Sequence, residues 1–591
     1  MNPRTFLSQF LLFVFFCVSV SAQPDGFRWW NPASAGFPVV EGQAWSAEVV
    51  KTYDRLPARA EKMVRPEVWN LSRHSAGLMI RFFSNSPDIR VRYTTGPNRQ
   101  MPHMPATGVS GVDMYAIDAE GNEFWCHGKY TFGDTVSYVF DGLRPNDNFH
   151  KRGREYRLYL PLYNSVEWME IGTPDTAIFT PLAVRPDKPI VIYGTSIAQG
   201  GCASRPGMAW TAILSRKMDR PLINLGFSGN GRLEPEIIEM IGEIDAKVFV
   251  LDCLPNMVPS RFSDEELQKR ILASVHYLQK RRPDVPILLT EHAGYTEEAL
   301  VPSRQEAYQA ANASLRMAFS QMKSEGVKNI FLLTKEELGL SMDGTVDGTH
   351  PTDLGMLEHA RGYEAVLRQI LHEPAGKYST TKPVTQYREP DNYDWQSRHR
   401  EIMKLNSEKP PRIVYMGNSI THFWGGTPAG PRRTGADSWD KYLEPLGVRN
   451  FGYGWDRVEN VLWRVYHGEL DGFTAEKVVI HIGTNNLHLN SDEEILAGME
   501  MLVAAVQHRQ PKAKILLIGT YPRRNYEERV TAFNQGLVRL SGKMNVGYAD
   551  PGLELLLENG KINEVMFYDG LHPNAEGYRK LGAKLVFWLK E

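Results

Sequence analysis

The sequence predicts an all-β sandwich followed by two α/β layered units, and three observations support this prediction. Residues 23–185 contain short strands of alternating polarity separated by turn signals. From residue 186 onward, short and continuously apolar runs alternate with helical stretches, which is typical of buried parallel strands with covering helices. This α/β pattern ends near residue 372 and begins again at 411 with its elements in the same order. The repetition indicates a duplicated domain.

In the β region, the segment DIRVRYTT at 88–95 alternates apolar and charged residues with the period of a half-buried strand. YRLYLPLY at 156–163 does the same, and 111–125 predicts two strands around a Glu-Gly-Asn turn. Repeated short strands of this kind favour a sandwich. The region contains no constellation of residues that predicts catalysis.

The two α/β units are expected at 186–372 and 411–591. The polar, proline-bearing segment between them, 373–410, is expected to be a linker with a lead-in helix at 396–405. Each unit holds five apolar runs that predict parallel strands. In the first unit the runs are 189–194, 221–226, 246–252, 286–292 and 329–334, and in the second they are 412–417, 448–452, 477–483, 514–519 and 546–550.

The N-terminus, residues 1–22, has the features of a secretory leader. Arg4 precedes a strongly apolar stretch at 6–20, and the small residues of VSA at 20–22 suit a signal peptidase, so cleavage is expected after Ala22. A membrane anchor is the alternative, although the stretch is short for a span. No later segment is apolar enough to cross a bilayer, so the mature protein is expected to be soluble and exported, to the periplasm or the medium.

The charge balance gives no reason to expect nucleic acid or an anionic membrane surface as a partner. The formal net charge is −2, and no long basic or acidic run occurs. The length of 591 residues is too great for a single core, so several domains are expected.

Two serines stand where the first strand of each unit meets a helix: Ser196 in GTSI and Ser419 in GNSI. At such a turn the hydroxyl is exposed near the helix N-terminus, where the local field favours negative charge. Asn256 and Asn485 follow the third predicted strand, where a side-chain amide could donate to an oxyanion. Taken singly, such serines are more often turn or capping residues, and asparagine is common in loops.

An Asp-Gly-X-His sequence closes each unit, as Asp347 with His350 and Asp569 with His572. At this spacing the carboxylate can reach the imidazole Nδ1, fix the tautomer and leave Nε2 to take a proton from a serine. Metal ligation is the alternative, but no third ligand recurs in both units, so neither a metal nor an organic cofactor is expected. The serine-to-histidine separation differs by one residue between the units and the serine-to-asparagine separation by six, so chance is a poor explanation.

Through these residues, both units resemble SGNH/GDSL hydrolases. The resemblance implies a flavodoxin-like α/β/α fold, a serine nucleophile, and an oxyanion hole made by a glycine N–H and an asparagine amide. The second unit is also similar to the catalytic subunits of platelet-activating-factor acetylhydrolase, through NFGYGWDRVENVLWRVYHGEL at 450–470, and to bacterial carbohydrate-active members, through GNSITHFWGG at 417–426. The N-terminal region, through SGVDMY at 110–115, resembles the β-domain that precedes some of these esterases.

The resemblance also implies which residues complete the oxyanion holes. In the first unit, Gly229 of GFSGNG takes the position of the oxyanion glycine. In the second unit Trp455 takes that position, so the N–H is expected from Trp455 or from its neighbour Gly454. CLPN replaces the Gly-X-Asn pattern of the family in the first unit, which leaves the register of Asn256 open.

Cysteines and tryptophans near the expected sites suggest further roles. If the fold is as expected, Cys202 and Cys253 both lie at the active-site edge of the sheet, where an exported protein could bridge them; free core thiols are the alternative. Trp424 and Trp455 could stack on sugar faces, with core packing as the alternative.

The expected function is that of an exported serine esterase with two sites. Its expected substrate, and its one expected partner, is an acetylated polysaccharide or oligosaccharide, as for an acetylxylan esterase. Hydrolysis of a lipid or phospholipid ester is the alternative within the same chemistry. A further alternative is that one unit is the esterase while the others bind carbohydrate.

Overall fold

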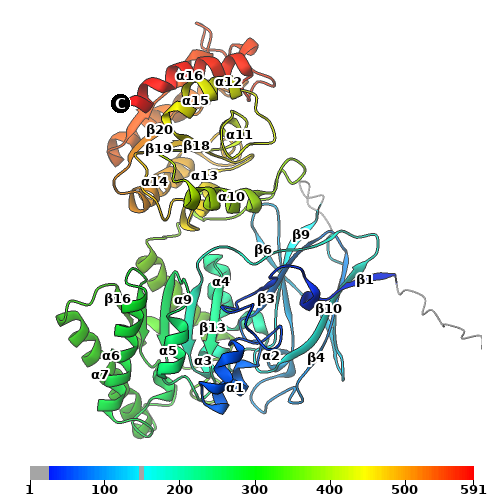
Figure 1. The fold of residues 1–591 in the computed structure, drawn as a ribbon, viewed down its shortest axis with the longest axis vertical. Helices are drawn as coiled ribbons and strands as arrows, with labels where there is room; N and C mark the ends of the chain where they lie inside the picture. Colours follow the sequence, from blue (N-terminus) through cyan, green and yellow to red (C-terminus); the bar gives the residue numbers. More distant parts are fainter. Residues whose placement is uncertain (1–25, 145–151) are drawn as a thin grey trace, which may run out of the picture.

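The computed structural model describes residues 26–144 and 152–591, which form three lobes (Figure 1). The predicted leader at 1–22 lies outside the described residues. The N-terminal β lobe and the first α/β lobe lie side by side, and the second α/β lobe stands at one end of this pair. None of the described helices is long and apolar enough to cross a bilayer.

The N-terminal lobe is a sandwich of two antiparallel sheets, as the sequence predicts. One sheet has the order β1-β10-β4-β8-β7, and the other has the order β11-β3-β9-β5-β6 with β2 paired to β3. In β4, Ile89, Val91 and Tyr93 are buried and the two arginines between them are half-buried, so the alternation in the sequence follows the two faces of the strand. The strands are β1 Phe27–Trp30, β2 Val40–Glu41, β3 Met79–Ser84, β4 Asp88–Thr95, β5 Asp113–Ile117, β6 Glu123–Cys126, β7 Lys129–Phe132, β8 Val136–Asp141, β9 Arg154–Tyr159, β10 Val166–Pro174 and β11 Phe179–Pro181.

The first α/β lobe is built on a parallel sheet with the order β13-β12-β14-β15-β16. Counted within the lobe this order is 2-1-3-4-5, the flavodoxin-like arrangement. Its strands are β12 Ile190–Gly194, β13 Leu222–Gly226, β14 Val248–Asp252, β15 Ile287–Thr290 and β16 Ile330–Leu333. Its helices are α3 Ser196–Gln199, α4 Trp210–Met218, α5 Pro235–Ile241, α6 Asp264–Arg281, α7 Pro302–Ser324, α8 Lys335–Leu338 and α9 Asp353–Leu371.

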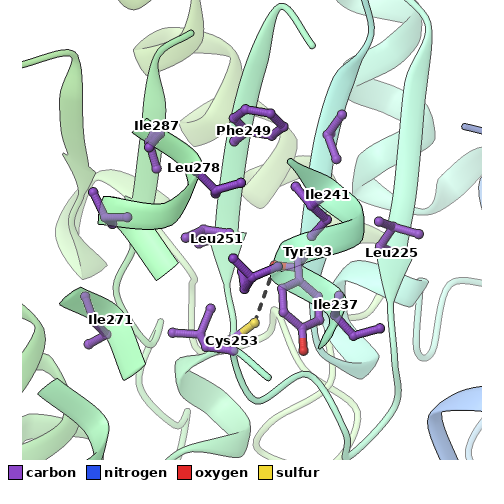
Figure 2. Close-up of a cluster of buried hydrophobic side chains, with 14 of the residues drawn as sticks. Tyr193, Leu225, Ile237, Ile241, Phe249, Leu251, Cys253, Ile271, Leu278 and Ile287 are labelled. Atoms are coloured by element: carbon purple, nitrogen blue, oxygen red, sulfur yellow. Dashed lines mark hydrogen bonds between the residues drawn. The ribbon is translucent and has the colours of Figure 1, made fainter. Parts of the chain in front are cut away.

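Hydrophobic clusters on both faces of this sheet explain why its strands are continuously apolar in sequence. On the face shown in Figure 2, Phe249 and Leu251 of β14 pack against Ile241 of α5 and Leu278 of α6.

The second α/β lobe repeats this topology, with the sheet order β18-β17-β19-β20-β21. The prediction of two flavodoxin-like units after a β-sandwich is therefore confirmed. Its strands are β17 Ile413–Gly417, β18 Val448–Gly452, β19 Lys477–His481, β20 Lys514–Ile518 and β21 Gly547–Ala549. Its helices are α11 Ser419–His422, α12 Ala436–Tyr442, α13 Val458–Tyr466, α14 Asp492–Arg509, α15 Glu527–Met544 and α16 Ala575–Lys590.

The segment between the α/β lobes packs onto the second of them. It contains α10, Trp395–Glu408, which includes the predicted lead-in helix, and Trp395 belongs to the hydrophobic core of the second lobe. The same segment contacts the N-terminal lobe, because Tyr387 donates a hydrogen bond from its hydroxyl to the buried Glu155 of β9, at 3.0 Å. Polar contacts also join the two α/β lobes, such as the bond from Trp463 Nε1 to Asp219 Oδ2 at 2.8 Å.

Candidate active site

Each serine is presented by a tight turn between the first strand of its lobe and a short helix. The strands end in Gly194 and Gly417, where a Cβ would lie 2.6 and 2.1 Å, respectively, from a side chain of the following helix. Only glycine therefore lets the helix turn back against the strand at these positions. Two residues later, Ser196 and Ser419 open α3 and α11.

In each lobe the serine, histidine and aspartate form one chain of hydrogen bonds. Ser196 Oγ lies 2.8 Å from His350 Nε2, and His350 Nδ1 lies 2.8 Å from Asp347 Oδ2. The corresponding two distances in the second lobe, joining Ser419, His572 and Asp569, are 2.9 and 2.8 Å. The structure thus brings together all six predicted residues, in the geometry that lets an imidazole accept the serine proton.

Local hydrogen bonds keep both aspartates ionised. Burial alone would raise the pKa of Asp347, but hydrogen bonds from the backbone N–H and the imidazole of His350 outweigh it and lower the pKa. The pKa of Asp569 is lowered by the same balance, with His572 as the donor. An ionised carboxylate on Nδ1 holds the tautomer in which Nε2 can act as the base.

Strand register shows that the two oxyanion regions correspond residue by residue. Gly194 is opposite Gly226 and Asp252 in the neighbouring strands, and Gly417 is opposite Gly452 and His481. In both lobes, the residue three positions after the first partner and the residue four positions after the second partner therefore hold matching places. The matching pairs are Gly229 with Trp455 and Asn256 with Asn485. Asn256 is therefore in the same register as Asn485, although the residues before it differ.

Gly229 and Trp455 also share one unusual backbone conformation. Their φ angles are +69° and +63°, in the left-handed region that favours glycine. A side chain in this region costs about 1–2 kcal/mol. The second lobe therefore keeps the backbone geometry of the oxyanion glycine and places a tryptophan there, 38% exposed.

The N–H of Gly454 is already committed, which favours Trp455 over Gly454 as the second oxyanion donor. Gly454 N donates to His422 Nδ1 at 3.1 Å. In the first lobe, the matching N–H of Ser228 donates to Gln199 Oε1 at 3.0 Å. Burial lowers the pKa of His422 well below its usual value, so the imidazole is neutral and Nδ1 can accept.

The asparagines lie at the same edge of the sheet as the serines. Asn485 is buried, and its Nδ2 donates to the backbone oxygen of Asp456 at 3.0 Å, immediately after Trp455. Asn256 is also buried, in the short 3-10 helix Leu254–Asn256 that follows β14. The Asn485 amide is thus next to the backbone N–H expected to complete the second oxyanion hole, and Asn256 holds the matching position in the first.

The predicted disulfide is wrong, because Cys202 and Cys253 are both free and buried. Cys253 packs in the hydrophobic cluster beneath α5 and α6, where its Sγ donates to the carbonyl of Tyr193 at 3.6 Å (Figure 2). Cys202 lies instead beside His350. Both cysteines follow strands that end at the same edge of the sheet, yet they lie in different surroundings. Their positions in the sequence do not reveal this difference.

Trp424 offers no exposed face on which a sugar could stack. It is fully buried, donates from Nε1 to Ser438 Oγ at 2.7 Å, and packs against Trp439 and Tyr578. The core-packing alternative for this residue is correct. Trp455 is the exposed tryptophan of the pair.

The N-terminal lobe contributes residues to the first site that sequence reasoning missed. Tyr163 donates from its hydroxyl to the carbonyl of Ser196 at 3.1 Å. The His103 ring lies 5.9 Å from the ring of His350, measured between centroids. In the part of the chain that the structure describes, the ligand atoms of His103, Cys202 and His350 all lie within 4.8 Å of one another, so this group could hold a metal ion. The second lobe holds no such group among the described residues.

The segment before α10 contributes to the second site in a similar way. Gln386 Nε2 and Tyr393 Oη donate to the carbonyl of Gly454, at 2.9 and 2.7 Å. Arg388 Nη1 donates to the carbonyl of Trp455 at 3.1 Å. These contacts join residues more than sixty positions apart, so the polar composition that predicts a linker gave no signal for them.

Sequence models of known families match three parts of the chain. The GDSL-like lipase/acylhydrolase family matches residues 187–368 and, with a second model, 415–580. A model of the N-terminal region of SGNH-hydrolase-type esterases matches 27–179.

The chain is similar to platelet-activating factor acetylhydrolase IB subunits. Subunit alpha2 of Homo sapiens is 31% identical over 192 residues, which are 32% of this chain and 80% of the relative. Subunit alpha1 of Homo sapiens is 29% identical over 191 residues, 31% of this chain and 78% of the relative. Among solved structures, a protein from Bacteroides ovatus assigned to the GDSL-like lipases is 31% identical, with a TM-score of 0.53, and the match covers 58% of this chain and 98% of that one.

Proposed function

Because this chain belongs to the SGNH/GDSL hydrolase family, we propose that it is a two-site serine esterase that removes O-acetyl groups from polysaccharides or oligosaccharides. One observation carries the proposal: a complete serine, histidine and aspartate hydrogen-bond chain occurs in both α/β lobes. Acyl ester hydrolysis is the chemistry of the family, and the acetylated carbohydrate is our proposal for the substrate.

The geometry indicates how each site would act. The serine Oγ attacks the ester carbonyl while the histidine Nε2 takes its proton, and the ionised aspartate stabilises the imidazolium. The serine N–H, the N–H of Gly229 or Trp455, and the amide of Asn256 or Asn485 would hold the tetrahedral oxyanion. The histidine then protonates the leaving alcohol. A water molecule, deprotonated by the same histidine, attacks the acyl-enzyme and releases the acid.

Three features support an acetylated carbohydrate. The curated relatives are named for acetyl hydrolysis, which suggests a small acyl group here. The exposed indole of Trp455, a residue of the second oxyanion loop, offers a flat surface of the kind that packs on sugar rings. We also propose that residues 1–22 direct export, which would bring the enzyme to extracellular polysaccharide.

Hydrolysis of an acetylated phospholipid is the second candidate, because the same relatives are named for platelet-activating factor. The two substrates differ in chemistry next to the ester. A polysaccharide presents neutral hydroxyl groups there, and a phospholipid presents an anionic phosphate.

The test separates the sites and the substrates. Ser196→Ala, Ser419→Ala and the double variant would be assayed on an aryl acetate, on acetylated xylan and on a 1-alkyl-2-acetyl-phosphocholine. We expect each single variant to retain the activity of the other site and the double variant to lose activity by about 10⁶-fold in kcat. Loss of all activity in one single variant would mean that the other lobe is a binding module. Turnover of the phospholipid without release of acetate from xylan would replace the proposed substrate with the second candidate.

A further inference from the structure

We propose that Glu389, in the segment between the two α/β lobes, accepts a hydrogen bond from a substrate hydroxyl at the second site and so selects acetyl esters of polyols. This inference rests on the proposed function and narrows it to one site and one kind of substrate contact.

Glu389 is held against the loop that forms the second oxyanion hole. A Cβ on Gly454 would lie 2.1 Å from Glu389 Oε2, so the carboxylate lies directly over that glycine. The preceding residue, Arg388, is bonded to the carbonyl of Trp455. The segment that carries Glu389 is thus tied to the loop that holds the expected oxyanion donor, the N–H of Trp455.

Catalytic and cationic groups of the site lie within electrostatic range of this carboxylate. Burial raises the pKa of Glu389, and the charges of Arg432 and His572 oppose that shift. Arg432 stacks over the ring of Phe423, 5.3 Å from its centroid, and that ring lies 5.5 Å from the ring of His572. The Glu389 carboxylate is therefore close enough to the catalytic imidazole and to Arg432 to interact with their charges.

One oxygen of the carboxylate has no hydrogen-bond partner among the described residues. Oε1 accepts from Asn392 Nδ2, but Oε2 is buried and unpaired. A buried acceptor without a partner costs free energy, and native proteins rarely retain one without a reason. In the first lobe the position that matches Gly454 is Ser228, whose N–H donates to Gln199 Oε1.

Oε2 is covered in this structure, so the Glu389 side chain would turn toward the bound ester and there accept a hydrogen bond from a substrate hydroxyl. A partly acetylated sugar carries such hydroxyls on carbons adjacent to the ester, and carboxylates are strong acceptors for them. A phosphodiester carries no donor and is repelled by a carboxylate. The geometry therefore favours a polyol acetate over an acetylated phospholipid at this site.

The experiment uses the full chain with Ser196→Ala, so that only the second site turns over. Its substrates are a mono-O-acetyl methyl xyloside with free neighbouring hydroxyls, the same ester with those hydroxyls O-methylated, and the acetylated phosphocholine. The variants are Glu389→Ala, Glu389→Gln and, as a matched control, Glu401→Ala, which removes an exposed carboxylate from α10.

We expect the ratio of kcat/KM for the hydroxylated ester to that for the methylated ester to fall by about 10- to 100-fold in Glu389→Ala, the range for a hydrogen bond to a charged group. Glu389→Gln should lose less, since its amide oxygen can still accept, and Glu401→Ala should not change the ratio. A structural role in the loop would slow both esters equally and leave the ratio unchanged.

The outcomes separate this inference from the function beneath it. If the parent deacetylates the xyloside and Glu389→Ala keeps the same ratio, an ordered water satisfies Oε2 and the inference is wrong while the function stands. If the parent with only the second site hydrolyses the phosphocholine and no xyloside ester, the proposed function fails, and the inference fails with it.

Discussion

The two α/β lobes hold the same catalytic groups at the same strand register, but different parts of the chain support those groups. In the first lobe, the N-terminal sandwich supplies the support: Tyr163 bonds to the carbonyl of Ser196, and Arg65 bonds to Asn230 Oδ1 at 2.8 Å. In the second lobe, Asp456 occupies the position of Asn230, and its Oδ1 accepts from Trp395 Nε1 at 2.8 Å.

This difference indicates what a duplication preserves. The turn after the first strand, the oxyanion loop and the late Asp-Gly-X-His sequence work only as a set, so both copies retain them. The outer contacts set which substrate groups meet the site, and there the copies diverge. His103 lies at the first site, whereas Glu389, Arg432 and Trp455 lie at the second. We therefore expect two esterase sites with unlike substrate preferences.

Removing the asparagine amide should cause the largest change after loss of the serine itself. Asn256→Ala, measured with Ser419→Ala, and Asn485→Ala, measured with Ser196→Ala, should each lower kcat on an aryl acetate by about 10²–10³-fold, because each removes one oxyanion donor. Steady-state kinetics of the four proteins would check this. A normal rate in only the Asn256 variant would show that the shared register does not give the two asparagines the same role.

The stability of the two lobes should change with pH in opposite directions, because of one buried residue in each. The end of the third strand holds Asp252 in one lobe and His481 in the other, both buried. Burial raises the pKa of Asp252 from 3.8 to about 7, so its stabilising contribution is present below pH 4 and is lost as the pH rises through 7. Burial lowers the pKa of His481 from 6.5 to about 3, so its contribution is present above pH 6.5 and is lost as the pH falls through 3.

Denaturant unfolding of Asp252→Asn and His481→Gln against the parent, between pH 4 and 8, would measure these effects. The stability of Asp252→Asn relative to the parent should increase with pH, and that of His481→Gln relative to the parent should increase as the pH falls. Each change should approach about 4 kcal/mol at its limit. Parallel curves for either variant and the parent would show that the group is not titrating as its burial implies.

The residue three positions after each serine accepts a hydrogen bond from the oxyanion loop in both lobes. We therefore expect the residue type of one lobe to serve in the other. His422→Gln gives the second lobe the amide acceptor that the first lobe has in Gln199, whereas His422→Leu leaves the N–H of Gly454 without its acceptor. The leucine variant should lose about 1–3 kcal/mol of stability, and the glutamine variant less. Thermal unfolding would compare them, and equal losses would mean that ring packing rather than the hydrogen bond matters here.

The smallest expected change comes from the residue with the left-handed backbone. Trp455→Gly should stabilise the second lobe by about 1–2 kcal/mol, because it relieves the strained φ angle. Gly229→Ala should destabilise the first lobe by about 1 kcal/mol, because alanine is strained at this φ angle. The added Cβ would meet no atom within 4 Å, so no steric clash adds to this cost. If Trp455→Gly is destabilising, packing of the indole outweighs the backbone strain.

The sequence was informative where structure depends on neighbouring residues. Apolar runs predicted the strands, and short motifs that recur at strand ends predicted which side chains would meet at one sheet edge. Position relative to distant elements was not predictable in this way. The buried place of Trp424, the separate surroundings of Cys202 and Cys253, and the contacts of Gln386 and Arg388 all depend on how remote segments pack.

Glu120, at the β5–β6 turn of the N-terminal lobe, accepts from Arg388 at 2.7 Å and from Arg457 at 2.5 Å. The sandwich thus reaches the second catalytic loop as well as the first. A fragment beginning at residue 411 would lack Gln386, Arg388 and Glu389, and one beginning at 379 would still lose the Glu120 contact. Expressing the second lobe alone should therefore weaken the scaffold of its catalytic loop, even though every residue of its serine, histidine and aspartate chain would be retained.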